Sequence, residues 1–256
     1  MIKTFQNEKI LANSLALEIL QELKKKKKLV LGCPGGRSLK KTYYYLGQLS
    51  HDLNISLDQL KIVMMDEYVE KIRGKYNIIN PNSHYSCVRF SKHVIKKLLN
   101  YKKNHKTSLK NKNILFPDIN KPNTYDLIIQ KLGGIDIFLL ASGSSDGHVA
   151  FNNIFSKLMQ RTHITKLSTK TRNDNMKTFP DFKKLSEVPQ YGLTVGLKTI
   201  FSLSKKGILV LTGKEKKRAF RRLQQLNKFD VSWPASIIFK CKKYKIYTDK
   251  LARSKK

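Results

Sequence analysis

Acidic residues, cysteines and prolines are scarce in this chain. The three cysteines, Cys33, Cys87 and Cys241, are scattered without a Cys-x-x-Cys pair, which argues against structural zinc and for reduced thiols. Seven prolines and thirteen glycines in 256 residues leave no room for long low-complexity segments. No apolar run approaches the ~20 residues that span a bilayer, and the first five residues lack the apolar region of a secretory signal. We therefore expect a cytoplasmic protein without a membrane partner.

The few acidic residues leave a large excess of positive charge. Only 18 Asp and Glu stand against 51 Lys and Arg, which gives a formal net charge of +33. This balance raises the hypothesis of a nucleic-acid partner. The lysines, however, are spread along the whole chain, and their one tight run, residues 24–28, lies where a predicted helix ends and cations suit its dipole. Nucleic-acid binding is therefore disfavoured, and the diffuse positive field favours anionic small substrates such as sugar phosphates.

Helical and strand-like segments alternate along the chain. The patterns predict helices over residues 8–26, 39–49, 83–99, 122–132 and 215–226, and strands over residues 29–31, 61–65, 133–141, 207–211 and 245–248. Residues 71–81 are predicted to be a polar loop, and residues 167–191 lack periodicity and are predicted to form a mobile flap over a site. The alternation is typical of an α/β protein whose parallel sheet is covered on both faces. The length and a hydrophobic content of 40% predict one domain over residues 1–256.

The most informative motif is Asp146-Gly147-His148, which follows the apolar run 135–141. In open α/β sheets the carboxyl ends of the strands are where ligands bind. The glycine lets the backbone turn sharply, so that both side chains can face one cavity. A histidine beside an acid can move protons near neutral pH. A surface turn is the alternative interpretation of this triplet.

Asp66 and Glu67 follow another buried strand and are expected at the same sheet edge. Two acids and an imidazole that converge there can abstract a proton beside a carbonyl group. For Asp66 and Glu67 alone, a helix cap with a solvated neighbour is the alternative.

Two further segments are candidates for holding an anion. The loop Gly35-Gly36-Arg37-Ser38 lies between a predicted strand and a helix, where backbone N–H groups and the helix N-terminus favour phosphate. It is neither a Walker loop nor a Gly-x-Gly-x-x-Gly fingerprint, and a plain turn is the alternative. Lys216 lies in the first turn of a later helix, where a cation opposes the dipole unless an anionic ligand is present. A solvated lysine is the alternative there.

Taken together, these segments resemble the glucosamine-6-phosphate deaminase (isomerase) family, which is related to the 6-phosphogluconolactonases. The resemblance covers about residues 30–249 and rests on Met65-Asp66-Glu67-Tyr68-Val69, Asp146-Gly147-His148-Val149-Ala150-Phe151-Asn152, Arg161-Thr162, residues 188–196 and residues 208–213. Their order and spacing match together, which is more specific than any single motif. The resemblance implies a Rossmann-like three-layer α/β fold with a mostly parallel sheet. It also implies hydrolytic deamination of glucosamine 6-phosphate to fructose 6-phosphate and ammonia, with no metal or organic cofactor.

The resemblance also implies a role for each matching residue. Asp66 is expected to be the base that moves a proton between C2 and C1 of the sugar, and His148 to assist ring opening while Asp146 orients it. The residues expected to hold the sugar phosphate are Gly36, Arg37, Ser38, Lys177 and Lys216. Relatives of this family often assemble, so a homo-oligomer is a further expectation.

The chain departs from the family pattern at several positions. Asn153 stands where the family has a glutamate that supports the histidine; it is therefore a candidate catalytic position, and its amide would leave the imidazole less easily charged. Lys177 replaces an arginine of the flap and loses the bidentate fork. His163 and Thr165 stand where basic residues of an allosteric pocket are expected, so activation by an acetylated amino-sugar phosphate is not predicted.

Two alternative functions remain open at this point. The Gly-Gly-Arg-Ser loop is closer to the lactonases, which hydrolyse 6-phosphogluconolactone with the same histidine motif. Lactonases, however, usually have Asp-Glu-Arg where this chain has Asp66-Glu67-Tyr68, and they lack the Ala-Phe-Asn continuation found here. Asn153 favours the second alternative, a sugar-phosphate-binding homologue with impaired catalysis.

Overall fold

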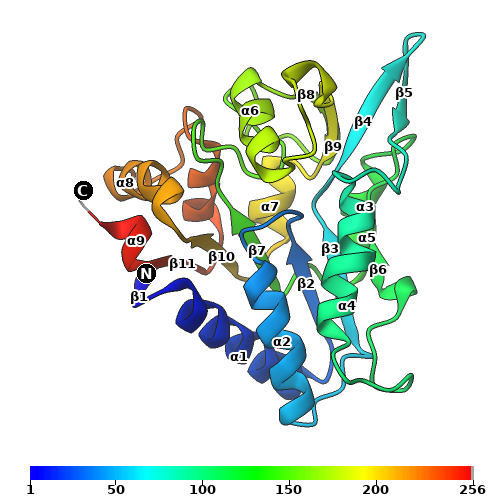
Figure 1. Cartoon of the computed structure of the whole chain (residues 1–256), viewed down its shortest axis with the longest axis vertical. Coiled ribbons are helices and arrows are strands. Elements are labelled where there is room, and N and C mark those ends of the chain that lie inside the picture. Colours follow the sequence, from blue (N-terminus) through cyan, green and yellow to red (C-terminus); the bar gives the residue numbers. More distant parts are fainter. Residues whose placement is uncertain (255–256) are drawn as a thin grey trace.

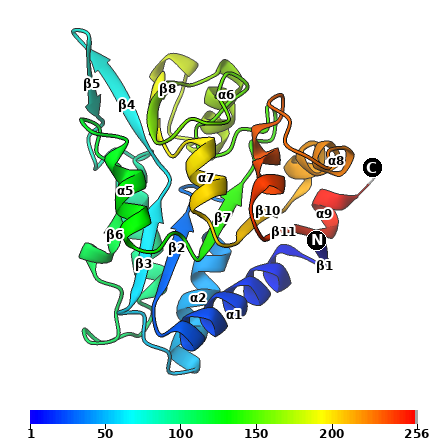
Figure 2. The same ribbon diagram turned by 180° about the vertical axis from the view of Figure 1, so that it is seen from behind.

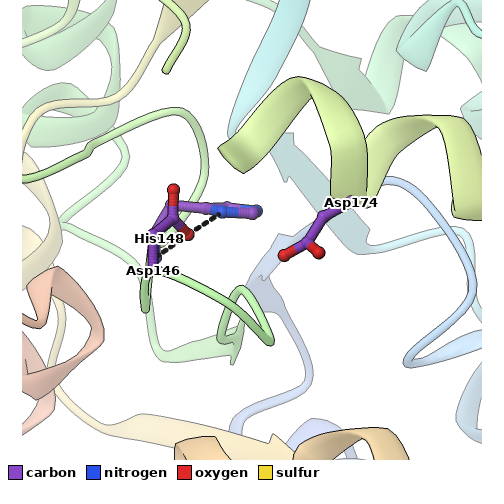
Figure 3. Close-up of side chains that lie close together, drawn as sticks. All are labelled: Asp146, His148 and Asp174. Atoms are coloured by element: carbon purple, nitrogen blue, oxygen red, sulfur yellow. Dashed lines mark hydrogen bonds and ion pairs between the residues drawn. The ribbon is translucent and has the colours of Figure 1, made fainter. Parts of the chain in front are cut away.

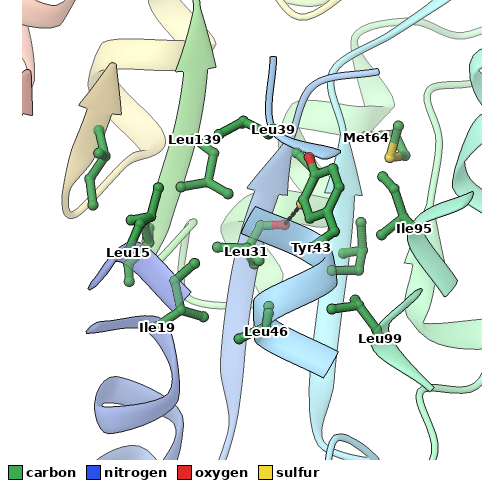
Figure 4. Packing of buried hydrophobic residues seen from close by; sticks show 14 of the residues in the cluster. Leu15, Ile19, Leu31, Leu39, Tyr43, Leu46, Met64, Ile95, Leu99 and Leu139 are labelled. Atoms are coloured by element: carbon green, nitrogen blue, oxygen red, sulfur yellow. Dashed lines mark hydrogen bonds between the residues drawn. The ribbon is translucent and has the colours of Figure 1, made fainter. Parts of the chain in front are cut away.

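Seven strands form a central sheet in which every neighbouring pair is parallel (Figure 1). In this computed structural model, which describes residues 1–254, the strand order is β1-β11-β10-β7-β2-β3-β6. The strands are β1 (Ile2–Phe5), β2 (Leu29–Cys33), β3 (Leu60–Met64), β6 (Ile114–Leu115), β7 (Ile137–Ala141), β10 (Gly207–Leu211) and β11 (Tyr244–Asp249). Leu29 and Leu31 of β2 pack in one hydrophobic cluster, part of which is drawn around Leu31 in Figure 4, and Val30 packs in another. This is expected for a strand buried on both faces.

Helices cover both faces of this sheet (Figures 1 and 2). One face is covered by α1 (Glu8–Lys26), α2 (Lys40–Asp52), α3 (Cys87–Phe90), a π-helical turn (Ser91–Ile95) and α4 (Lys96–Leu99). The other is covered by α5 (Thr124–Lys131), α7 (Leu197–Leu203), α8 (Lys217–Gln225) and a 3₁₀ segment (Pro234–Lys240). The chain ends with α9 (Lys250–Arg253). The predicted three-layer α/β fold with a parallel sheet is thereby confirmed, and none of the described helices is both long and apolar enough to cross a membrane.

A second, antiparallel sheet was not predicted. Its order is β5-β4-β9-β8, with β4 (Asp66–Ile72), β5 (Lys75–Ile78), β8 (His163–Lys166) and β9 (Tyr191–Thr194). The prediction of a loop over residues 71–81 is wrong, because most of this segment belongs to the β4–β5 hairpin, which turns at Arg73 and Gly74 with positive φ. All four residues of β5 are exposed, so the strand has no buried face and leaves no alternating pattern in the sequence.

The segment 167–191 is likewise more regular than predicted. It contains α6 (Thr169–Thr178), a 3₁₀ turn (Leu185–Glu187) and the first residue of β9. The side chain of Ser168 caps α6 by accepting a hydrogen bond from the N–H of Thr171. Only Thr171 and Asn175 of this helix are buried, and both are polar. The helix therefore has no apolar stripe, which is the signal that sequence analysis depends on.

Candidate active site

A cavity of about 310 Å³ is lined by loops at the carboxyl ends of β2, β7 and β10. Seven of the nine predicted site residues line it: Gly36, Arg37, Ser38, Asp66, His148, Lys177 and Lys216. The other two, Asp146 and Asn153, line an adjoining open cleft of about 890 Å³. The carboxyl ends of parallel strands lie along one sheet edge, so loops far apart in the sequence can supply one site there.

The loop after β7 holds Asp146 against His148 (Figure 3). Asp146 Oδ1 accepts a hydrogen bond from His148 Nδ1 at 2.7 Å, and both side chains are mostly buried. Gly147 between them has a φ of 69°, and a Cβ at this position would lie 2.3 Å from the ring of Trp233. Only glycine fits both the backbone conformation and the space, so Gly147 permits the turn that brings the acid to the imidazole.

Two hydroxyl groups from the start of α6 complete this arrangement. Ser168 Oγ and Thr171 Oγ1 donate to Asp146 Oδ2 at 2.9 and 2.8 Å. Burial opposes ionisation of Asp146, but the hydrogen bonds with His148 and Thr171 and the interaction with the imidazole outweigh it and hold the pKa of Asp146 well below its usual range. An ionised Asp146 only accepts hydrogen bonds, so the imidazole proton lies on Nδ1 and Nε2 is left for a ligand.

Ser168 and Thr171 were not among the residues that the sequence predicted for the site. They lie in the segment predicted to be an aperiodic flap, more than twenty residues after Asp146. The one available signal was Ser168 itself, because serine is favoured at helix N-caps, and this signal is weak without an apolar stripe.

Asn153 is buried, 3% exposed, and does not line the 310 Å³ cavity. Its Nδ2 donates to the carbonyl oxygen of Lys166 at 3.0 Å, and its Oδ1 accepts from the N–H of Phe155 at 2.9 Å. Within residues 1–254 no hydrogen bond joins Asn153 to His148; the imidazole is contacted by Asp146 and, at 3.3 Å, by Thr171 Oγ1. The contacts of Asn153 therefore stabilise the loop that follows the histidine motif.

These contacts predict that Asn153→Glu lowers thermal stability and does not raise activity. A carboxylate cannot donate to the carbonyl oxygen of Lys166, and an unsatisfied buried acceptor costs about 1–3 kcal/mol. Calorimetry should therefore show a melting temperature several degrees lower, with Asn153→Gln as the control that keeps the amide. A gain in turnover by Asn153→Glu would show instead that the family glutamate can be restored here.

Asp66, the first residue of β4, brings a second carboxyl group to the cavity. Its backbone is fixed by pairing with Thr194 of β9, and its Oδ1 accepts a hydrogen bond from the thiol of Cys87 at 3.4 Å. Burial raises the pKa of Asp66 to about 7, helped by the charge of Glu67 and opposed by the Cys87 hydrogen bond and by His148. A carboxyl group that titrates near neutral pH can take up and release a proton during a reaction.

Glu67 does not line the cavity. Its carboxylate accepts the N–H groups of Tyr68, Cys87 and Val88 and the hydroxyl of Ser86, all within 3.0 Å. It thus satisfies the free N–H groups at the start of α3, which is a structural role. The alternative of a helix cap with a solvated neighbour is wrong in one respect, because both Asp66 and Glu67 are buried.

Three cationic side chains also line the cavity. Arg37 and Lys177 are exposed at its rim, and Gly36, with a φ of 83°, shapes the loop before α2. Lys216 lies deeper, and its Nζ donates to the carbonyl oxygen of Ser142 at 2.7 Å. Burial lowers the pKa of Lys216, although the neighbouring carboxylates of Asp174 and Glu215 oppose this. Three cationic side chains around one cavity are suited to a phosphate group.

Lys216→Met is expected to raise KM for a phosphorylated substrate about tenfold or more, with a smaller change in kcat. A hydrogen bond to a charged group contributes about 1.5–3 kcal/mol, and the methionine keeps the length of the side chain without its charge. Steady-state kinetics with Lys214→Met as the matched control would measure this, because Lys214 lies on the adjoining cleft. An unchanged KM would remove Lys216 from the phosphate site.

One group of described residues has the spacing of metal ligands. Donor atoms of Asp146, His148 and Asp174 all lie within 4.8 Å of one another (Figure 3). Several of these atoms already have partners: His148 Nδ1 contacts Asp146, and Asp174 Oδ2 accepts hydrogen bonds from the N–H groups of Ser144 and Ser145. Asp174 thereby ties α6 to the loop that carries the histidine motif.

The family profile described as glucosamine-6-phosphate isomerases/6-phosphogluconolactonase matches residues 6–248. A glucosamine-6-phosphate deaminase of Mycoplasma mycoides subsp. mycoides is 31% identical over 250 residues, which are 98% of this chain and 95% of that enzyme. Glucosamine-6-phosphate deaminase 1 of Bacillus subtilis is 32% identical over 218 residues, which are 84% of this chain and 83% of that enzyme.

Solved structures agree with the sequence relatives. A monomeric glucosamine-6-phosphate deaminase superposes with a TM-score of 0.83 at 26% identity, over 98% of both chains. A 6-phosphogluconolactonase from Thermotoga maritima superposes with a TM-score of 0.67 at 16% identity, over 97% of this chain and 98% of that one, which shows a shared fold. The chain therefore belongs to the glucosamine-6-phosphate isomerase/6-phosphogluconolactonase family.

Proposed function

We propose that this protein is a glucosamine-6-phosphate deaminase that converts glucosamine 6-phosphate and water to fructose 6-phosphate and ammonia. The observation that carries the proposal is that Asp66 and His148 line one cavity, where burial raises the pKa of the Asp66 carboxyl group to about 7. An aldose–ketose conversion needs a base at the carbon that loses its proton and an acid or base at the ring oxygen. The cationic side chains of Arg37, Lys177 and Lys216 supply a place for the phosphate, and the deaminases among the relatives act on this kind of sugar.

In the proposed reaction, Nε2 of His148 assists the proton transfer that opens the sugar ring. The ionised Asp66 then takes the proton from C2 of the open-chain aldehyde and returns it to C1, while a proton passes from the amino group to the C1 oxygen. The C1 carbonyl group thereby becomes an alcohol, and C2 becomes an imine. Water adds at C2, and the carbon–nitrogen bond breaks to release ammonia and leave the ketone. Asp146 does not exchange protons in this scheme; it holds the imidazole in one tautomer and one orientation.

The test is the release of ammonia and fructose 6-phosphate from glucosamine 6-phosphate, measured with coupled assays. Turnover that is lost in both Asp66→Asn and His148→Ala would support the proposal. If 6-phosphogluconolactone is hydrolysed instead, and Asp66→Asn leaves this activity intact, the protein is a lactonase, because lactone hydrolysis needs no base at C2. Binding of the sugar phosphate without turnover of either compound would identify a homologue that binds without catalysis.

The assembly of this protein into a homo-oligomer stays a prediction. The similar deaminase of known structure is described as monomeric, which supports a site that is complete within one chain. Light scattering coupled to size exclusion would measure the mass directly against the 29.6 kDa of one chain. The predictions of a cytoplasmic location and of no nucleic-acid partner also stay predictions.

A further inference from the structure

The thiol of Cys87 lies beside the proposed base. Cys87 is the first residue of α3, and its Sγ is 3.4 Å from Asp66 Oδ1. Both side chains line the cavity, yet Cys87 is only 5% and Asp66 only 7% exposed. A thiol in such a place can donate a hydrogen bond to the carboxyl group with little competition from water.

The position of this thiol is fixed from two sides. The N–H of Cys87 donates to Glu67 Oε1 at 3.0 Å, which holds the start of α3 against β4. On the other side, a Cβ at Gly35 would lie 3.2 Å from Sγ, so the glycine leaves just enough room for the sulfur. Since both the backbone and the side chain of Cys87 are held, the contact with Asp66 is a fixed feature of the site.

The thiol can only act as the donor in this contact while Asp66 is ionised. Burial raises the pKa of Cys87 well above its usual value, and the nearby Asp66 and Glu67 raise it further, so the sulfur keeps its proton. A donor to Oδ1 stabilises the carboxylate relative to the carboxylic acid. It also engages one oxygen and leaves Oδ2 for the substrate carbon.

Several other groups influence Asp66 from the surrounding elements. Glu67 from β4 raises the pKa of Asp66, and the imidazole of His148 from the loop after β7 lowers it. The hydroxyl groups that interact with Asp66 belong to Tyr43 of α2, Tyr68 of β4 and Tyr125 of α5. Among these groups and Cys87, the thiol alone makes a side-chain hydrogen bond to the carboxyl group of Asp66 within residues 1–254.

We propose that Cys87 is a positioning residue for Asp66: its thiol holds Oδ1, aims Oδ2 at the substrate and favours the ionised form that abstracts the proton. The inference deepens the proposed function and rests on it. Cys87 itself neither touches the reacting atoms nor changes its protonation state in this role.

The test compares pH profiles of kcat/KM for Cys87→Ala, Cys87→Ser and the wild-type protein. In Cys87→Ala the apparent pKa on the acidic side of the kcat/KM profile should rise by about half a pH unit, which is the size expected for the loss of one modest hydrogen bond. Activity near pH 6 should then fall about threefold more than activity above pH 8. Cys87→Ser, which keeps a hydrogen-bond donor, should return this apparent pKa to the wild-type value. Cys241→Ala removes another buried thiol and is the matched control.

A second measurement separates this inference from the proposed function. The ¹³C resonance of the Asp66 carboxyl group, assigned with Asp66→Asn, reports its titration without any turnover, and Cys87→Ala should move that titration upwards by the same amount. If the wild type has no activity, the proposed function fails but the titration still decides the role of Cys87. An equal loss of activity at every pH, or a titration that stays in place, would reduce Cys87 to a packing residue and overturn the inference.

Discussion

Asp66→Asn is expected to lower kcat/KM for deamination by about 10³-fold, because general base catalysis contributes about 10²–10⁴-fold and an amide cannot accept the proton. The asparagine has the same shape and can keep the contact with the Cys87 thiol, so substrate binding should change little. Coupled assays of ammonia release, together with the binding of fructose 6-phosphate by calorimetry, would measure both quantities. A variant that keeps more than a tenth of the wild-type rate would remove Asp66 from the reaction.

The same residue predicts the pH dependence of the wild-type enzyme. A base must be ionised to act, and burial raises the pKa of Asp66 to about 7. Below this pH, kcat/KM should therefore fall about tenfold for each pH unit. A profile that stays flat between about pH 5 and about pH 8 would contradict this assignment.

The free energy of unfolding should fall with rising pH over the range in which activity rises. The pKa of Asp66 is about 7 in the folded chain against an ordinary value of 3.8, so between these pH values the folded state holds a proton that the unfolded state has released. The stability of the wild type therefore falls as the pH rises towards 7, at up to about 1.4 kcal/mol per pH unit. Asp66→Asn has no proton to lose. Its advantage in melting temperature over the wild type should grow from about pH 4 to about pH 7 and then stay constant.

Gly143→Ala is the second substitution with a large expected effect. A Cβ at Gly143 would lie 2.2 Å from His148 Nδ1 and 2.7 Å from Asp146 Oδ1. These two atoms share a hydrogen bond, and the N–H of Gly143 donates to the carbonyl oxygen of His148 at 2.7 Å. Neither the two side chains nor the backbone of Gly143 can therefore move freely. The methyl group must displace the imidazole, and a shift of about 1 Å at a catalytic group can cost about 10²-fold in rate.

The control for this variant is Gly74→Ala in the β4–β5 hairpin. Gly74 has a φ of 82°, and a Cβ at this position would have no neighbouring atom within 4 Å, so its substitution adds backbone strain without touching the site. We expect Gly74→Ala to lose some stability and to keep its activity, whereas Gly143→Ala loses activity first. A crystal structure of Gly143→Ala with the hydrogen bond between Asp146 and His148 in place would show that the loop can relax.

The amino-acid sequence by itself determined the central α/β architecture. Apolar runs such as residues 137–141 and 207–211 are buried on both faces, which is the environment of strands in a parallel sheet covered by helices. Because the carboxyl ends of these strands share an edge, the motifs that follow them could be assigned to one site without coordinates. Of the seven predicted residues that line the cavity, six follow strands of this sheet, and the seventh, Lys177, belongs to α6.

Tertiary structure alone decided the second sheet, the helix α6 and the contacts that tune the site. These elements bury few apolar side chains, so they leave no hydrophobic period in the sequence. Ser168, Thr171 and Cys87 act through hydrogen bonds that join positions about twenty residues apart, and such contacts have no local signature. The same holds for Asn153, where the sequence suggested a partner of the histidine and the fold turns the side chain to the backbone instead. Apolar periodicity reports which face of an element is buried, whereas the direction of a polar side chain depends on the partners that the fold brings to it.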